Sequence, residues 1–512
     1  MYGANLAGLL DGPARHCADK GALLVGERVE RTWAQLAEAV ARRAGGLRER
    51  HLIEPGDAVA LFAANHPLYL ETLFAIWHAG AVAVPISSRL HAREAADIVA
   101  RSHARLCFAT ADVAEGLLAE VAVPAPVFGA EEDAALGRFE PVAARPRLPG
   151  DDAWIFFTSG TTGKPKGARL SHSNLWAMAA AYMADSATVE PRDGIIHVAA
   201  LSHASGLMCL PWVARGGAQV LPESMGFDAD ELFGLVAAGE RSSFFVPPTL
   251  LRRLSAHPLA SEIDPEKIGT ILVGAAPVLP ADLRDGVAAF GPRVWNGYGQ
   301  GESPCTITAH GKEAIAAAVA AGDEDALRSV GVARVGLAVR TLDEAGIEVA
   351  PGEVGEVCVD GPTVMSGYLD MPEATAAALA GGWLHTGDLG FFDEAGRLTL
   401  VDRAKDVVIT GGYNVYPREV EDVLELDPAV AEVAVVGVAD PEWGERIVAF
   451  VVTAEGAELD PAKLDRRCLD AIARHKRPKQ YLPIDELPRN PGGKVLKGAL
   501  RERAAGAGDG AA

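Results

Sequence analysis

Cysteine is scarce in this sequence, and long apolar runs are missing. The six cysteines include no CxxC pair and no metal-ligand spacing, which argues against a disulfide framework or a zinc site. No stretch of about 18 apolar residues occurs, and the first twenty residues lack a basic segment followed by an apolar run. We therefore expect neither secretion nor a membrane span, but a cytoplasmic protein with reduced thiols.

Positive charge is also in deficit. The sequence has 47 Lys and Arg against 69 Asp and Glu, a formal charge of −22. A broad surface for nucleic acid or anionic lipid is therefore not expected, because such partners require clustered basic residues. A polyanion such as ATP would need a local pocket. The sequence leaves the oligomeric state open, a homodimer included.

The 512 residues are too many for one ordinary core, so several structural units are expected. Between residues 30 and 130, amphipathic stretches such as TWAQLAEAVARRAGGLRER alternate with apolar runs such as AVALFAAN and AVAVPIS. The same rhythm returns between 195 and 300, with IIHVAAL, AQVLPES, SSFFVPP, TILVGAA and RVWNGYG. This alternation predicts an α/β fold with a largely parallel sheet, in two similar halves.

The pattern changes around residues 393 to 405, where Gly- and Asp-rich turns separate short strands. Two short helices with strands VAEVAVVGV and RIVAFVVTA between them follow. We predict a large N-terminal domain at 1–402 and a smaller α+β domain at 403–512. The terminal AAGAGDGAA is small and polar enough to be a frayed tail.

The clearest chemical motif directly follows the apolar run WIFF. Its glycines let backbone amides approach an anion, its hydroxyls donate hydrogen bonds and its lysines supply charge, which together suit a triphosphate. It is not a Walker loop, because its glycine spacing is too short. A flexible surface linker is the alternative. The predicted phosphate-binding residues are Thr158, Ser159, Gly160, Thr161, Thr162, Gly163, Lys164 and Lys166.

This motif resembles the phosphate loop of the adenylate-forming superfamily, which includes acyl-CoA synthetases, luciferases and peptide-synthetase adenylation domains. The later motifs of that family follow in order. They are Gly297-Tyr-Gly-Gln-Gly-Glu302, Trp383-Leu-His-Thr-Gly-Asp388, Asp402-Arg-Ala-Lys-Asp406 with Gly411-Gly-Tyr-Asn414, and Leu487-Pro-Arg-Asn-Pro-Gly-Gly-Lys494. The sequence is thus identified as a member of the superfamily, most similar to its acyl- and aryl-CoA ligases.

The resemblance implies an in-line attack by a carboxylate on the α-phosphorus of ATP. Lys494 is then the catalytic lysine that bridges the carboxylate and the α-phosphate, and Glu302 holds Mg²⁺ on the phosphates. Asp388 binds the ribose hydroxyls, with Arg403 beside it, and Lys405 is the hinge about which the small domain swings between two half-reactions. Without the resemblance, each would be an ordinary surface or turn residue.

The resemblance also places the adenine and coenzyme A. The adenine lies against small residues after the strand TILVGAA and beside a tyrosine that can stack: Gly274, Ala275, Ala276, Pro277, Asn296, Gly297, Tyr298 and Gly299. Coenzyme A is met by an aromatic residue, a basic cluster and the paired glycines of the hinge region: Trp443, His475, Arg477, Lys479, Gly411 and Gly412. A basic helix end is the alternative interpretation of that cluster.

The acyl pocket carried over from the family is mostly apolar. It comprises His203, Phe245, Ala275, Gly299, Gln300, Gly301 and Pro304. His203 could instead be an ordinary core histidine. Malonate-specific relatives carry an arginine where this sequence has Gly297, and no acidic residue in 201–206 could pair with an amino group. An uncharged aryl or short-to-medium alkyl acid is therefore predicted.

One position departs from the family pattern, because Gly301 stands where the family has threonine. The missing hydroxyl would cost about 1.5 to 3 kcal/mol at the α-phosphate if Thr161, Thr162 or water did not replace it. Alternatively, Gly301 widens the acyl pocket, which we prefer.

The sequence therefore predicts an AMP-forming acyl-CoA ligase that uses ATP, Mg²⁺ and coenzyme A. An adenylating enzyme with another acceptor, a luciferase-like oxygenase, or a non-catalytic nucleotide-binding relative are the alternatives. The identity of the acid stays open.

Overall fold

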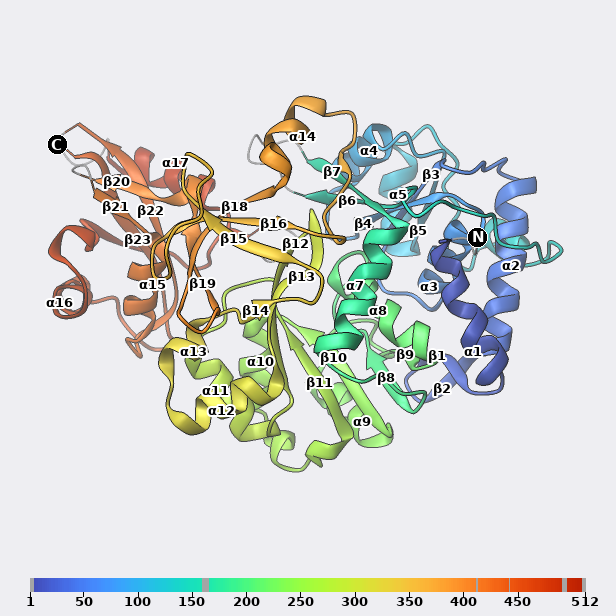
Figure 1. The fold of residues 1–512 in the computed structure, drawn as a ribbon, viewed down its shortest axis with the longest axis horizontal. Helices are drawn as coiled ribbons and strands as arrows, with labels where there is room; N and C mark the ends of the chain where they lie inside the picture. The colour runs from blue at the N-terminus through green and yellow to red at the C-terminus, as the bar shows by residue number, and fades with distance from the viewer. Residues whose placement is uncertain (1–3, 159–164, 411–412, 442, 490–494, 509–512) are drawn as a thin grey trace. The chain divides into compact units, whose positions relative to one another are not determined.

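The computed structural model describes residues 4–158, 165–410, 413–441, 443–489 and 495–508 (Figure 1). Its mixed α/β architecture confirms the predicted fold class. The chain divides into two compact units: Met1–Val339, Val359–His385 and Gly396–Leu398 form the first, and Arg340–Cys358, Thr386–Ala395 and Thr399–Ala512 form the second. This division differs from a single cut after residue 402, because two earlier segments pack with the C-terminal residues. The functional boundary at 402 and 403 stays a prediction.

A nine-stranded sheet is the larger of the two sheets in the first unit. Its strands from β12 to β1 are parallel, as expected for apolar runs joined by helices. In spatial order the strands are β14 (Val332–Ala333), β13 (Ser303–His310), β12 (Val294–Gln300), β11 (Ile268–Val273), β10 (Arg241–Val246), β8 (Asp193–Ile196), β9 (Ala218–Leu221), β1 (Gly21–Val25) and β2 (Arg28–Thr32).

A six-stranded sheet forms the second half of this unit. Its strands β3 and β4 are buried along their whole length, which fits a sheet covered on both faces. In spatial order the strands are β17 (Gly367–Tyr368), β7 (Lys166–Ser171), β6 (Asp152–Thr158), β4 (Val82–Ser87), β3 (Ala58–Ala63) and β5 (Leu106–Ala109).

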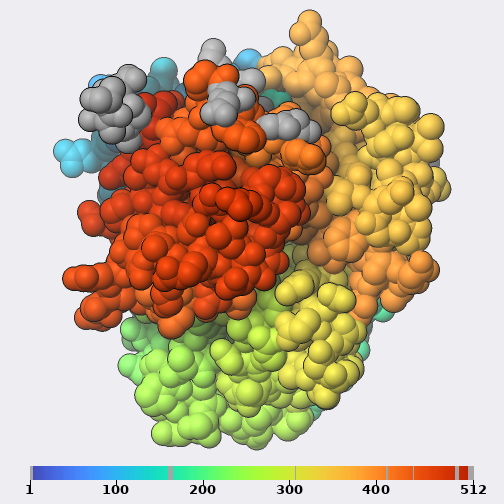
Figure 2. All heavy atoms as spheres, turned by 90° about the vertical axis from the view of Figure 1, so that its left-hand side faces the viewer, coloured from blue at the N-terminus to red at the C-terminus, as the bar shows by residue number. Residues whose placement is uncertain are grey.

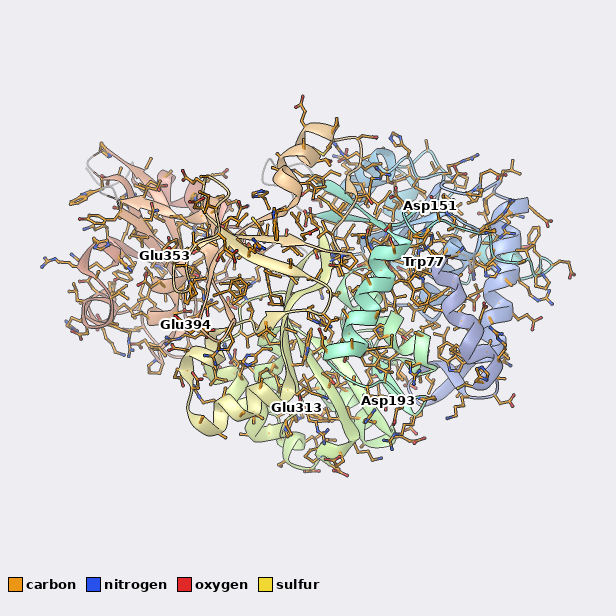
Figure 3. All side chains as sticks on the ribbon, in the orientation of Figure 1. Trp77, Asp151, Asp193, Glu313, Glu353 and Glu394 are labelled. Carbon is orange, nitrogen blue, oxygen red and sulfur yellow. The ribbon has the colours of Figure 1, made fainter. Side chains whose placement is uncertain are left out.

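Helices that pack on these sheets complete the main core. α2 (Trp33–Glu49) begins at a capping box formed by Thr32 and Gln35, and α3 (Pro67–His78) is buried over most of its length. Trp77, labelled in Figure 3, donates its indole N–H to the carbonyl of Ala153 at 2.8 Å.

The other helices of this unit are α1 (Asp11–His16), α4 (Ala92–Arg101), α5 (Ala111–Leu118), α6 (Glu131–Leu136), α7 (His172–Asp185), α8 (Ala204–Arg215), α9 (Ala229–Ala238), α10 (Pro248–Ser255), α11 (Pro280–Phe290), α12 (Lys312–Ala321), α13 (Glu324–Arg328) and α14 (Pro372–Ala378).

Two further sheets follow in the chain. The four-stranded sheet has the order β15 (Ala338–Leu342), β16 (Gly355–Asp360), β18 (Leu384–Phe392) and β19 (Leu398–Arg403). The second unit, drawn mainly in orange and red in Figure 2, has its own apolar core around the antiparallel pair β22 and β23. The pair belongs to a five-stranded sheet of β21 (Tyr413–Val415), β20 (Val408–Thr410), β23 (Gly444–Thr453), β22 (Val430–Asp440) and β24 (Gln480–Pro483). The helices of the second unit are α15 (Pro417–Glu425), α16 (Pro461–Ala471) and α17 (Lys497–Gly508).

The structure also describes the state of the cysteines and the apolarity of the helices. All six cysteines fall within the described residues, and none of them forms a disulfide there. Over the same part of the chain, no helix combines the length and apolarity needed to cross a membrane.

Candidate active site

A buried carboxylate marks the centre of the site in the first unit. Glu302 sits in the tight connection between β12 and β13 and is 7% exposed. Its Oε1 accepts hydrogen bonds from the hydroxyl of Thr158 at 3.2 Å and from the hydroxyl of Tyr368 at 2.8 Å. Thr158 ends β6 and Tyr368 lies in β17, so three separate strand ends meet at this carboxylate.

Tyr368 stays a hydrogen-bond donor because of its surroundings. Burial, together with the negative charge of Glu302, raises the pKa of Tyr368 well above its ordinary value. The ammonium of Lys166 lies 5.0 Å from the centre of the Tyr368 ring, a cation–π contact. Thr158 and Lys166 therefore hold the two ends of the predicted phosphate loop next to Glu302. Ser159, Gly160, Thr161, Thr162, Gly163 and Lys164 lie outside the described residues.

Gly301, the residue before Glu302, lines a cavity of about 210 Å³, and every residue predicted for the acyl pocket is part of this lining. Apart from the neutral imidazole discussed below, its described lining is apolar or uncharged, with no Asp, Glu, Lys or Arg. An uncharged group therefore suits it best. The lining is Phe156, His203, Ala204, Leu207, Met208, Phe245, Leu272, Val273, Gly274, Ala275, Trp295, Gly297, Gly299, Gln300, Gly301, Pro304 and Cys305.

His203 lies just before α8 and forms part of the cavity wall. Its Nδ1 is 2.9 Å from the hydroxyl of Ser202, and its ring meets Phe156 edge to face at 5.8 Å. Burial, with a smaller effect from the positive charge of Arg89, lowers the pKa of His203 below its ordinary value. The imidazole is therefore neutral at pH 7, consistent with an uncharged pocket.

The segment before His203 is fixed by a buried amide from the other sheet. Asn65, which follows β3, accepts a hydrogen bond from Leu201 N at 2.9 Å and donates to the carbonyls of His197 and Ala199 at 3.0 Å. Gly206 completes this turn, because a Cβ at that position would lie 1.9 Å from the carbonyl oxygen of Leu201. Only glycine fits there. The backbone of this turn therefore determines where His203 and the cavity wall that it forms, the His203 wall, are placed.

The predicted adenine-binding segment follows β11. A Cβ on Gly274 would lie 2.8 Å from the carbonyl oxygen of Gly297, so the two backbones approach closely where the resemblance places the base. Ala275 has a φ of 68°, a strained conformation for a residue with a side chain, which often marks a binding site. Asn296 is buried and Tyr298 partly buried on the neighbouring strand. Ala276 and Pro277 continue this segment.

Gly301 makes room for two neighbours. A Cβ at this position would lie 2.5 Å from Cγ2 of Thr158 and 2.8 Å from Cδ1 of Phe156. The family's threonine would therefore collide with side chains that themselves line the site. That Gly301 widens the acyl pocket stays a prediction. That another group replaces the missing threonine hydroxyl at the α-phosphate also stays a prediction.

The predicted residues of the second unit form pairs of their own. The guanidinium of Arg403 is 3.1 Å from the carboxylate of Asp388. The ammonium of Lys479 lies 5.1 Å from the ring centre of Trp443, and the rings of His475 and Tyr413 meet at a tilt with their centres 4.6 Å apart. Arg477 pairs with Asp465, and Lys405 is exposed within a short 3-10 turn. Gly411, Gly412 and Lys494 lie outside the described residues.

Sequence reasoning missed three residues that organise the site: Tyr368, Asn65 and Trp295. Tyr368 lies in the segment Ser366-Gly-Tyr-Leu369, which offers no local sign of its contact with a residue 66 positions away. Trp295 could have been found, because the two-residue period of a strand puts it on the same face as Gly297 and Gly299.

Comparisons with known proteins identify the family of the chain. Residues 10–369 match the family model of the AMP-binding enzyme, and residues 419–494 match that of the AMP-binding enzyme C-terminal domain. The chain belongs to the AMP-binding enzyme family.

Three similar proteins indicate the range of that family. A feruloyl-CoA synthase from an Amycolatopsis species is 38% identical, over 92% of this chain and 94% of the relative. An indoleacetate–CoA ligase from Aromatoleum aromaticum is 35% identical, over 92% of each chain. The ATP-bound crystal structure of MatB from Rhodopseudomonas palustris has a TM-score of 0.89 and 30% identity, covering 98% of this chain and 99% of that one. The predicted class, an adenylate-forming CoA ligase, is thereby confirmed.

Proposed function

We propose that this protein is an ATP-dependent, cytoplasmic acyl-CoA ligase whose acid is an uncharged, compact aryl acid. The observation that carries the proposal is the uncharged cavity of about 210 Å³, whose lining includes Gly301, the residue before Glu302 and in close approach to Thr158. A carboxylic acid with an apolar body can place its body in that cavity and its carboxylate at the phosphates. The two CoA ligases described above take aromatic acids, which favours an aryl acid over an alkyl one.

The first half-reaction joins the acid to AMP. An oxygen of the carboxylate attacks the α-phosphorus, and pyrophosphate leaves with the electrons of the broken P–O bond. Thr158 and Lys166 hold the ends of the phosphate loop, and Lys494 is assigned the bridge between carboxylate and phosphate. In the second half-reaction the thiol of coenzyme A attacks the acyl carbon and AMP leaves.

Glu302 is suited to a magnesium ion. Its Oε1 is occupied by two hydroxyl donors, and the contacts found among the described residues leave Oε2 without a hydrogen-bond partner. A buried carboxylate with one available oxygen fits the preference of Mg²⁺ for hard oxygen ligands. When bound, the ion would neutralise charge on the phosphates. The hydroxyls of Thr158 and Tyr368 fix the direction in which the available oxygen points.

The test is pyrophosphate release with ATP and Mg²⁺ over benzoates, cinnamates and C2 to C12 fatty acids, each with and without coenzyme A. We expect benzoates or cinnamates to stimulate release and coenzyme A to raise turnover. Release that does not respond to coenzyme A would point to another acyl acceptor. Silence across the panel would contradict the proposal.

A variant separates the two half-reactions. Lys494→Ala should abolish acid-dependent pyrophosphate release while largely sparing transfer from supplied acyl-AMP to coenzyme A, because the lysine is assigned to the first step alone. Equal loss of both steps would contradict that assignment.

A further inference from the structure

Trp295 is a buried part of the wall of the acyl cavity. In β12, Trp295, Gly297 and Gly299 share one face, and all three line the cavity. The two glycines leave that face open, whereas the indole fills it. At about 3.3 Å per residue, Gly297 and Gly299 leave about 7 Å of that face open, and the indole occupies the next position on it. The strand therefore forms a trough that is closed at one end by a single large side chain.

The indole is held by contacts on the side away from the cavity. Its N–H donates to the hydroxyl of Ser186 at 3.1 Å, and its ring meets Tyr182 edge to face at 6.2 Å. The guanidinium of Arg334 lies 5.6 Å from the ring centre and is itself 2.6 Å from the carboxylate of Asp185. Trp295 is 2% exposed. These contacts fix the ring in place, so it acts as a wall and not as a mobile gate.

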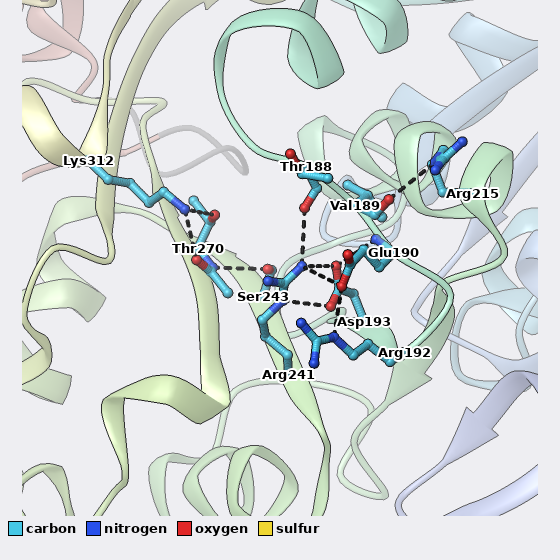
Figure 4. Close-up of polar contacts among 11 residues, drawn as sticks. Thr188, Val189, Glu190, Arg192, Asp193, Arg215, Arg241, Ser243, Thr270 and Lys312 are labelled. Atoms are coloured by element: carbon cyan, nitrogen blue, oxygen red, sulfur yellow. Dashed lines mark hydrogen bonds and ion pairs between the residues drawn. The ribbon is translucent and has the colours of Figure 1, made fainter.

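A second cavity, of about 420 Å³, lies on that other side, and Ser186 and Asp185 are part of its lining. Polar side chains surround it (Figure 4). The ammonium of Lys312 donates to the carbonyl of Gly269 and the hydroxyl of Thr270 at 3.1 and 3.2 Å, and Arg241 pairs with Asp193 at 2.6 Å. The second cavity is therefore a poor environment for an apolar acid.

The two cavities are neighbours along three shared elements, β10, β11 and α8, and each element lines both cavities with the same face. On β10, Ser243 lines the second cavity and Phe245 the acyl cavity, and on β11 Thr270 and Leu272 divide in the same way. On α8, Trp212 lines the second cavity, and Met208, one turn earlier, lines the acyl cavity. Trp295 has its ring at the acyl cavity and its N–H bonded at the polar one.

We propose that Trp295 is the partition between these cavities and sets the largest acid that the pocket accepts. This inference rests on the proposed function and narrows its substrate class. An apolar cavity of about 150 Å³ holds one benzene molecule. The acyl cavity of about 210 Å³ therefore has room for one ring and a short linker. A second ring in line with the first would meet the indole.

The experiment compares Trp295→Leu with Trp212→Leu. Both changes remove a buried indole, but Trp212 lines the polar cavity alone. Pyrophosphate release is measured with benzoate, cinnamate and biphenyl-4-carboxylate. We expect Trp295→Leu to raise kcat/KM for the biphenyl acid relative to benzoate about tenfold or more, because a pocket that gains space changes selectivity by at least this factor. Trp212→Leu should leave the ratio unchanged.

Binding decides the question independently of turnover. The affinities of non-reactive sulfamoyl analogues of the benzoyl and biphenylcarbonyl adenylates, measured by calorimetry, should shift in the same direction in Trp295→Leu. If that variant does not fold, Trp295→Phe removes the Ser186 bond and part of the ring, and should show a smaller shift. An unchanged ratio in a folded Trp295 variant, or an equal shift in Trp212→Leu, would overturn the inference. No acid-dependent pyrophosphate release by the wild type would overturn the proposed function instead, and the analogue affinities would still test the partition.

Discussion

Replacing Tyr368 by phenylalanine should weaken the use of magnesium ATP and leave the use of the acid almost unaffected. The substitution removes the hydroxyl that donates to Oε1 of Glu302 at 2.8 Å and keeps the ring that lies under Lys166. A hydrogen bond to a charged group contributes about 1.5 to 3 kcal/mol. Tyr368 does not line the acyl cavity, so the acid should be bound as before.

The size of the effect follows from the role of that bond. If the hydroxyl directs Glu302 in the transition state, its loss should lower kcat/KM for magnesium ATP roughly tenfold to a hundredfold, since about 1.4 kcal/mol corresponds to a factor of ten. Because the pKa of Tyr368 is raised, the hydroxyl stays protonated throughout the physiological range. The defect in the variant should therefore be the same from pH 6 to pH 9.

The assay is pyrophosphate release with magnesium ATP varied at saturating acid, followed by the converse. Tyr69→Phe is the matched control, because the hydroxyl of Tyr69 is buried and lacks a hydrogen-bond partner within the described residues. That control should keep full activity and be equally or more stable. The reasoning would be refuted if Tyr368→Phe had an unchanged kcat/KM for magnesium ATP. An equal fall in kcat/KM for the acid, caused by a higher KM for the acid, would refute it as well.

Three other changes test separate parts of the structure. Gly301→Thr should lower the unfolding free energy by about 1 to 3 kcal/mol and slow adenylation, because its Cβ would lie 2.5 Å from Thr158 and 2.8 Å from Phe156; faster pyrophosphate release would contradict this. Burial lowers the pKa of His197 to about 4, so the unfolded chain alone gains a proton as pH falls from 7 to 5. His197 should then contribute about 2 kcal/mol to the unfolding free energy that is lost over that interval, so urea unfolding of His197→Gln should show a loss smaller by about this amount. Trp443→Ala should raise the KM for coenzyme A without altering pyrophosphate release in its absence, and a change confined to ATP would argue against the assigned contact.

The fold was accessible from sequence because buried parallel strands are continuous apolar runs. TILVGAA and RVWNGYG cover most of β11 and β12, and AVALFAAN contains β3. The position of Glu302 was accessible because a short motif fixes it on the turn after β12. In both cases the informative residues are neighbours along the chain, so local pattern and family resemblance are sufficient.

The remaining features depend on contacts between distant segments. The bond from Tyr368 to Glu302 exists because β17 pairs with β7, a registration that the two residues of β17 do not signal. The collision at Gly301 depends on two side chains from β6. The role of Trp295 depends on α7 and Arg334, which decide what lies behind the indole. Such relations are properties of packing and appear only once the elements are placed.

The amide of Asn65 has a consequence for the design of hybrid enzymes. It comes from the half of the first unit built on the six-stranded sheet, yet its three hydrogen bonds fix the backbone from His197 to Leu201, which leads into the His203 wall. A hybrid enzyme that exchanges residues 193–305 alone would keep His203 and the segment before it but lose the hydrogen bonds from Asn65. The recipient would have to supply an asparagine at the same place. Acid preference should therefore be inherited together with a residue more than a hundred positions upstream of the segment 197–201 that it supports.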